Sequence, residues 1–137
     1  MTSQPSFNEK KGKFQEHIEA SLKDSYKKYS RNNISDIVLT FLGIALSTTV
    51  TILAFWEDAT LAGILGAISA SVLSIQEVYN FNEKANFYRR LNMKTKQLRD
   101  ELKYKVSSDD DMEKIVDKFL ALRDDRISNN PRRKKIE

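Results

Sequence analysis

The side chains that could carry out chemistry are few in this sequence. His17 is the only histidine and there is no cysteine, so neither a transition-metal site nor a thiolate nucleophile is expected. The acidic run Asp109–Asp111 follows Ser108, which is the order typical of a helix N-terminus. There is no glycine-rich phosphate loop and no serine–histidine–aspartate set. We therefore expect no enzyme activity, no cofactor and no metal.

A second group of polar residues lies inside apolar sequence. Thr40, Ser47 and Thr51 fall on one helical face and could line a water path in an oligomer. Their hydroxyls could instead bond carbonyls of their own helix, so local packing stays open as the alternative. Glu77 ends the second apolar segment, where a ring of carboxylates would attract cations. Its alternative is a solvated interfacial glutamate or one paired with a nearby lysine.

Positive charge is missing from the middle of the chain. No lysine or arginine occurs between Arg31 and Lys84, although seven precede this gap and sixteen follow it. Two apolar runs, Ile37–Trp56 and Leu61–Ile75, lie within the gap. As a helix, the first run is about 30 Å long, the thickness of a bilayer core. A cation at the bilayer centre costs about 2.5–3.5 kcal/mol or more, which explains the gap.

Helix-capping and helix-breaking residues mark the expected ends of the elements. Residues 1–12 are expected to be loose. Asn32-Asn33 should end the first helix, and Ser35-Asp36 should cap the next one. No glycine or proline occurs between Gly66 and Pro131, so the second membrane helix should continue unbroken into water. The expected elements are a helix over 13–31, membrane helices over 34–56 and 59–79, a stalk continuing to 105, a helix over 108–129 and a basic tail over 130–137.

These elements predict a single-domain, all-α membrane protein. It would be a two-helix transmembrane hairpin with an N-terminal amphipathic helix, a long cytoplasmic helical stalk and a short C-terminal helix. The first helix, the stalk and the last helix should form a bundle. Cations flank the hairpin, whereas its turn over 56–60 has none and contains Glu57 and Asp58. Both termini should therefore face the cytoplasm from the plasma (inner) membrane.

Small residues dominate the second membrane helix. Two adjacent ladders run along it, Ala62, Gly66, Ala70 and Ser74 in one, and Gly63, Ala67 and Ser71 in the other. Such ladders let helix backbones approach closely in lipid. We interpret at least one as a subunit interface, with packing inside the hairpin as the alternative.

The stalk carries a near-heptad apolar stripe. Its members, taken as a coiled-coil-like interface that faces partners, are Phe81, Tyr88, Leu91, Leu98 and Leu102. The basic residues around it are interpreted as a solvated helix face, with a site for a nucleotide or lipid phosphate as the alternative; they are Arg89, Arg90, Lys94, Arg99, Lys103 and Lys105. Direct DNA binding is not expected.

The order of these parts resembles a known family. The run Phe81–Leu91, with Lys84-Ala85 and Tyr88-Arg89 inside it and Leu98 and Leu102 beyond, is similar to the SLATT family. These are the "SMODS and SLOG associating two-TM effector" domains of bacteria. The resemblance implies an anti-phage effector that oligomerises and permeabilises the inner membrane. It also implies a separate trigger, either a cytosolic signalling partner or a nucleotide second messenger, and carries over no ligand-binding residues.

Two functions follow as expectations. The first is an oligomeric pore or membrane-disrupting effector, because two helices cannot by themselves enclose a water path. Roughly four or more subunits in the lipid bilayer would be needed. The second is a two-helix anchor that does not conduct and whose stalk docks a cytosolic partner. The sequence leaves both open.

Overall fold

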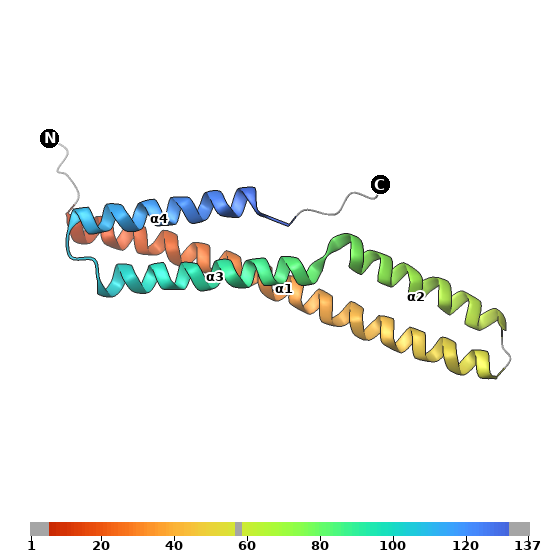
Figure 1. Ribbon diagram of the computed structural model, residues 1–137. Coiled ribbons are helices and arrows are strands. Elements are labelled where there is room, and N and C mark those ends of the chain that lie inside the picture. The colour runs from red at the N-terminus through yellow and green to blue at the C-terminus, as the bar shows by residue number, and fades with distance from the viewer. Residues whose placement is uncertain (1–5, 57–58, 132–137) are drawn as a thin grey trace. The chain divides into compact units, whose positions relative to one another are not determined.

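Every regular element that the computed structural model describes is a helix. It describes residues 6–56 and 59–131, and these form α1 (Phe7–Phe55), α2 (Ala59–Tyr79), α3 (Phe81–Tyr104) and α4 (Asp109–Ser128) (Figure 1). The predicted all-α class is confirmed for this part of the chain. The two acids expected in the turn, Glu57 and Asp58, and the basic tail over 132–137 lie outside the described residues.

The helices belong to two compact units. Of the described residues, 6–29 and 86–130 form one, to which α1, α3 and α4 contribute, and we call it the three-helix bundle. The described residues between 30 and 85 form the other, and we call its helical part, the rest of α1 together with α2, the helix pair. The expected bundle of the first helix, the stalk and the last helix is thus observed.

α1 is one helix of 49 residues, so the predicted break at Asn32-Asn33 is wrong. The expected helices over 13–31 and 34–56 are parts of the same element. Asparagine is worse than alanine in a helix by only about 0.7 kcal/mol or less, which is too little to stop a helix that packs along its length. Asp36 does not cap a helix; instead its Oδ1 accepts a hydrogen bond from Gln76 of α2 at 3.3 Å.

α1 also begins earlier than expected. Ser6 precedes it, and the Ser6 Oγ accepts a hydrogen bond from the backbone N–H of Glu9 at 3.3 Å. The Ser6 carbonyl accepts another from the N–H of Lys10 at 3.0 Å. Ser6 and Glu9 have the S-x-x-E spacing of a capping box, a signal that was present in the sequence. Residues 7–12, expected to be loose, are therefore helical.

The expected unbroken helix from 59 to 105 is interrupted at Asn80. Its φ is 50°, in the left-handed region, and it separates α2 from α3. Asparagine enters this region more readily than most residues, so neither glycine nor proline is needed for a kink. The Asn80 side-chain amide donates to the carboxylate of Glu83, and the rings of Tyr79 and Phe81 stack with centroids 5.5 Å apart. Side-chain contacts therefore hold the kink.

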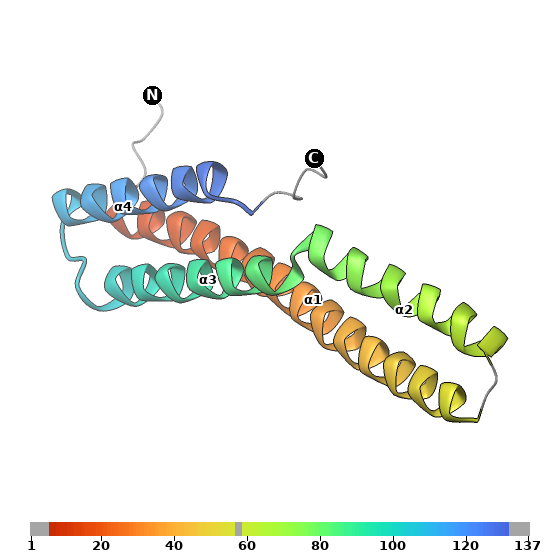
Figure 2. The same ribbon diagram turned by 45° about the vertical axis from the view of Figure 1, so that its right-hand side comes forward.

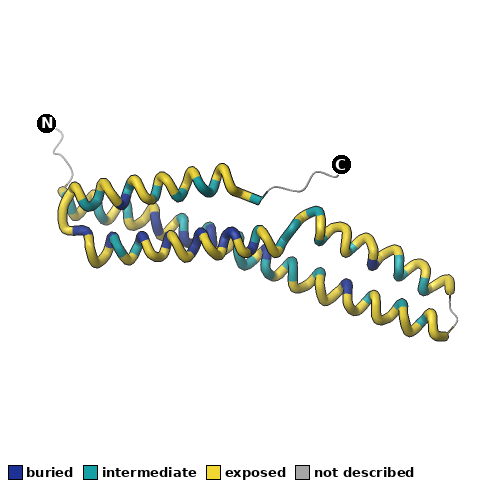
Figure 3. Tube along the Cα trace, in the orientation of Figure 1, coloured by how far each residue is buried: buried dark blue, intermediate teal, exposed yellow. Residues whose placement is uncertain are grey.

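The three-helix bundle has its own apolar core. One cluster of buried residues consists of Ile18, Leu22, Leu102, Val106 and Ile115, with Phe14 and Phe119 packed against it. A second consists of Phe87, Tyr88 and Leu91, with Tyr29 and Leu122 against it. Figure 3 shows the buried residues gathered along the first part of α1 and along α3. The bundle thus buries its apolar side chains by contacts within one chain.

α4 begins where the sequence predicted. Ser108 has extended backbone angles, and its Oγ accepts a hydrogen bond from the N–H of Asp111 at 3.2 Å. This confirms Ser108 as the N-cap. At the other end the N–H of Asn129 donates to the carbonyl of Asp125 at 2.9 Å, and the helix stops before Pro131.

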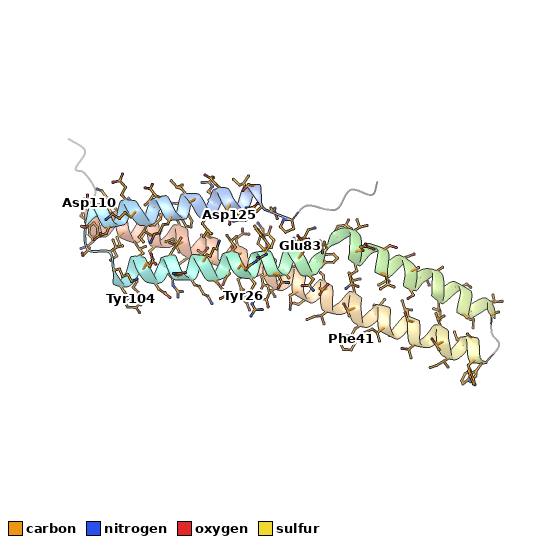
Figure 4. The ribbon with its side chains drawn as sticks, viewed as in Figure 1. Tyr26, Phe41, Glu83, Tyr104, Asp110 and Asp125 are labelled. Atoms are coloured by element: carbon orange, nitrogen blue, oxygen red, sulfur yellow. The ribbon has the colours of Figure 1, made fainter. Side chains whose placement is uncertain are left out.

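The helix pair, in contrast, carries its apolar side chains on the outside. Phe41 is 73% exposed and projects from α1 on the side away from α2 (Figure 4). Two helical segments, Phe7–Phe55 and Ala59–Tyr104, are long and apolar enough to cross a membrane. Only 6% of the most apolar 18 residues of each is buried. The core helix of a soluble protein would be mostly buried by the rest of the protein. The apolar residues of the helix pair are not.

Leu102→Ala should destabilise the three-helix bundle by about 2–5 kcal/mol, because a fully buried leucine is replaced and a cavity remains. Leu120→Ala is the matched control, since Leu120 of α4 is 47% exposed, and it should cost about 1 kcal/mol or less. Urea-induced loss of helical circular dichroism, measured on the full chain in detergent micelles, gives both values. Equal losses would contradict the assigned core.

Candidate functional site

Polar side chains join α1 to α2 along one line. The Gln76 Nε2 donates to the Thr40 Oγ1 at 2.8 Å and to the Asp36 Oδ1 at 3.3 Å. The hydroxyl oxygens of Ser47 and Ser69 lie 3.1 Å apart. We call these five residues the polar seam. Since the contacts advance along α1 as they recede along α2, the two helices are antiparallel (Figures 1 and 2). Such bonds between helices contribute about 0.6–2 kcal/mol in lipid.

Close packing accompanies the polar seam. Gly43 is buried, and a methyl group there would lie 3.4 Å from the Leu73 Cδ2, so α1 and α2 are in van der Waals contact at this point. Ser69, only 6% exposed, is the small residue that packs against α1, and it was not anticipated from the sequence. A signal existed, because Ser69 and Gln76 are seven residues apart, as are Thr40 and Ser47, and heptad spacing keeps residues on one face.

An open groove follows the polar seam on the surface of the helix pair. One part, of about 480 Å³, is lined by Asp36, Thr40, Leu73, Gln76, Glu77 and Asn80–Asn82. A second part, of about 320 Å³, shares Thr40, Leu73 and Gln76 with the first, and adds Gly43, Ile44, Ser47 and Thr48. The groove therefore presents hydroxyl, amide and carboxylate groups along a helix pair that is otherwise apolar.

Three of the four candidate pore residues line the groove, and the fourth does not. Thr40 and Ser47 line the groove and also belong to the polar seam. Glu77 is exposed and lines one part of the groove. Thr51 does not line it; its Oγ1 donates to the carbonyl of Ser47 at 3.0 Å. For Thr51, the alternative of local bonding within its own helix is the observed one.

Most of the small-residue ladder is left open by the chain itself. Beyond α2, no described atom lies within 4 Å of where a Cβ would stand on Gly63 or Gly66. Ala67, Ala70, Ser71 and Ser74 are exposed, and Ala62 is half-buried. The hydroxyls of Ser71 and Ser74 each bond a carbonyl of α2 at 2.9 Å. Packing against α1 therefore does not account for the exposed ladder residues, which we call the small-residue face.

The apolar stripe of α3 has a different role from the one predicted. Tyr88, Leu91, Leu98 and Leu102 are all buried, and Leu102 is fully so. Leu102 clusters with residues of α1 and α4, and Tyr88 and Leu91 pack with Tyr29 of α1 and Leu122 of α4, so the prediction that the stripe faces partner chains is wrong for these residues. A heptad stripe records burial but does not say which chain covers it. Phe81, the fifth member, stacks on Tyr79 in the other unit.

Ion pairs help to hold α4 in the bundle. The Arg126 Nη2 lies 2.6 Å from the Asp24 Oδ2, and the Lys118 Nζ lies 2.8 Å from the Glu101 Oε2. Hydrogen bonds from Lys28 and then Arg126 lower the pKa of Asp24, and Lys118 lowers the pKa of Glu101. A carboxyl with a lowered pKa stabilises the fold above its unfolded pKa of about 4. That contribution is lost as the pH falls through the folded pKa, so acid weakens the docking of α4.

The fold and this site define a class: a helical protein with two segments able to cross a membrane and a polar seam between them. No family model, no curated protein and no solved structure matches the chain. Among the described residues, no group of three or more histidine, cysteine, aspartate or glutamate side chains could hold a metal ion.

A disulfide tests the register of the polar seam, because the chain has no cysteine of its own. Ser47→Cys with Ser69→Cys should cross-link within one chain under mild oxidation, since the native oxygens are 3.1 Å apart. In detergent, maleimide reactivity should disappear while the mass stays that of one chain. Ser47→Cys with Ser71→Cys is the control, because Ser71 is exposed and bonds its own helix, and it should stay reactive. The opposite pattern would contradict the register.

Proposed function

We propose that the helix pair crosses a membrane as a two-span hairpin with both termini on the cytoplasmic side. Its exposed apolar side chains and the absence of Lys or Arg between residues 31 and 84 support this. Aromatic residues stand at both ends of the pair, Trp56 at one and Tyr79 at the other. The Lys84 Nζ lies 5.6 Å from the centre of the Tyr79 ring. Aromatic and basic residues of this kind occupy membrane interfaces.

Several copies then assemble through the small-residue face. At Gly63 and Gly66 a Cβ would meet no described atom beyond α2, so this face offers the close backbone approach on which helix association in lipid depends. In the bundle, in contrast, Tyr88, Leu91, Leu98 and Leu102 of the apolar stripe are already buried within the chain. Contacts between subunits are therefore assigned to the membrane segment rather than to the stalk.

The assembly permeabilises the membrane. The observation that carries this proposal is the groove of polar groups beside an open small-residue face on an otherwise apolar pair. Glu77 follows Gly66 by eleven residues and Ala70 by seven, so the three share one face of α2. With that face toward a common axis, small residues leave room for water and Glu77 stands where the path meets the cytoplasm.

The resemblance of residues 81–91 to the SLATT family supports the biological setting. On that basis we place the protein at the bacterial inner membrane as a defence effector. Its trigger would be a separate cytosolic partner or a nucleotide signal. The three-helix bundle is the part of the chain available to receive it.

A non-conducting anchor is the second candidate, and the polar seam favours it. Thr40, Ser47 and Gln76 find partners inside the helix pair, so the pair satisfies these groups without further subunits. In that case the helix pair only holds the bundle at the membrane, where the bundle docks another protein.

Liposomes containing the purified chain separate the two functions. With candidate nucleotides added as the trigger, a pore should release a trapped dye more steeply than in proportion to protein density, because assembly depends on density, whereas an anchor should release none at any density. Gly66→Leu should abolish release by blocking close approach, a cost of about 1–3 kcal/mol per contact. A Cβ at Gly66 meets no described atom of the single chain, so we attribute the effect to contacts with another chain. Gly12→Leu, equally open but in the bundle, should leave release unchanged.

Glu77→Gln tests whether Glu77 lies at the cytoplasmic end of the proposed water path. It keeps the shape and removes the charge, so cation preference should fall while assembly survives. Reversal potentials in a planar bilayer under a salt gradient measure this. High salt should blunt the effect in the parent, because ions screen the carboxylates over about 8–10 Å. If the reversal potential is unchanged, Glu77 lies outside the path.

A further inference from the structure

The three-helix bundle contains a cavity that the proposed pore does not use. It has a volume of about 200 Å³ and lies among α1, α3 and α4. Its lining divides into apolar side chains, hydroxyls and guanidinium groups, and no acidic side chain lines it in the described part of the chain. We propose that this cavity binds a small amphipathic anion, an aromatic group that carries a phosphate or a carboxylate.

The apolar lining suits an aromatic ring. Leu91 and Leu122 belong to a buried cluster of the bundle, and Phe119 completes the lining. The Phe119 ring is fixed by an edge-to-face contact with Phe14, with centroids 5.6 Å apart. An apolar protein cavity of about 150 Å³ is enough for benzene. A cavity of about 200 Å³ therefore has room for a ring and a small head group.

The hydroxyl groups offer further hydrogen bonds. Thr95 is fully buried and its Oγ1 donates to the carbonyl of Leu91 at 2.9 Å, so the oxygen can still accept. Ser21 is half-buried, and within the described residues its hydroxyl has no recorded hydrogen bond. It can donate to an oxygen of the anion.

The cationic lining selects the charge of the ligand. Arg123 and Arg126 lie three residues apart on α4, on the face that also carries Phe119 and Leu122. Arg126 is held in place by Asp24 at 2.6 Å, and Lys28 offsets that carboxylate from 2.9 Å. Arg123 is exposed and has no ion pair among the described residues. A guanidinium group binds phosphate or carboxylate with two parallel hydrogen bonds, so Arg123 is the principal anion ligand.

Binding would act on the whole bundle. The lining comes from three helices, so an occupied cavity links α4 to α1 and α3 and stabilises the folded bundle by mass action. Binding in this cavity involves only residues of the three-helix bundle, so it does not depend on conduction by the helix pair.

The experiment uses the full chain in detergent micelles and phenyl phosphate as the probe. Phenyl phosphate should raise the unfolding midpoint of the bundle in a saturable way. Benzoate in a parallel series shows whether the head group is preferably phosphate or carboxylate. Phenol and inorganic phosphate, each supplying half of the probe, should act much more weakly at equal concentration. No saturable effect of either amphipathic anion would overturn the proposal.

Two variants locate the site. Arg123→Gln should weaken binding by about tenfold or more, because a charge-assisted contact is lost. Arg90→Gln is the control, since Arg90 is exposed on α3 and does not line the cavity; it should bind normally. Ser21→Phe should fill the cavity and abolish binding while the bundle stays folded. Equal weakening by both arginine variants, or binding that survives Arg123→Gln and Ser21→Phe, would place the anion elsewhere and overturn the proposal.

Discussion

The rest of the structure depends on one constraint: the apolar side chains of the helix pair must leave water, and the chain does not cover them. Phe41, Phe55 and Trp56 are each more than 70% exposed, and Ile44 of α1 and Ile64 of α2 are each more than half exposed. Transfer out of water contributes about 25 cal/mol for each Å² of apolar surface, so such a surface needs an apolar environment. A bilayer supplies it, and helices suit a bilayer because they satisfy their backbone groups internally.

The division of the chain follows from the same constraint. Lysine and arginine are absent between Arg31 and Lys84, whereas in the three-helix bundle α1, α3 and α4 bury an ordinary apolar core around Ile18 and Leu102. In the helix pair the order is inverted, with polar groups between the helices and apolar groups outside. Ser47, Ser69 and Gln76 can be tolerated there because each has a partner across the pair. What stays open is a polar groove and a face of small residues.

Much of this could be predicted from the sequence. Charge and apolar length indicated two helices able to cross a membrane, and Ser108 was identified as a cap because its side-chain chemistry is local. The helix end predicted at Asn32-Asn33 is absent, and the kink observed at Asn80 was not predicted. An asparagine can continue a helix or kink it, and tertiary contacts decide which. The stripe of α3 was recognised, but periodicity cannot show that its cover comes from the same chain. Ser69 was missed because its signal, the seven-residue spacing to Gln76 that Thr40 and Ser47 repeat, links two helices rather than one.

The absence of cysteine allows the membrane assignment to be measured directly with single substitutions and a membrane-impermeant maleimide. Thr60→Cys should react from outside intact cells, and Tyr104→Cys, at a site 74% exposed in the bundle, only from the cytoplasmic side of inverted vesicles. Phe41→Cys and Ile68→Cys should react from neither side until detergent is added, although both positions are exposed in the isolated chain. If Phe41→Cys and Ile68→Cys react in intact membranes as readily as Tyr104→Cys, the helix pair does not lie in the bilayer.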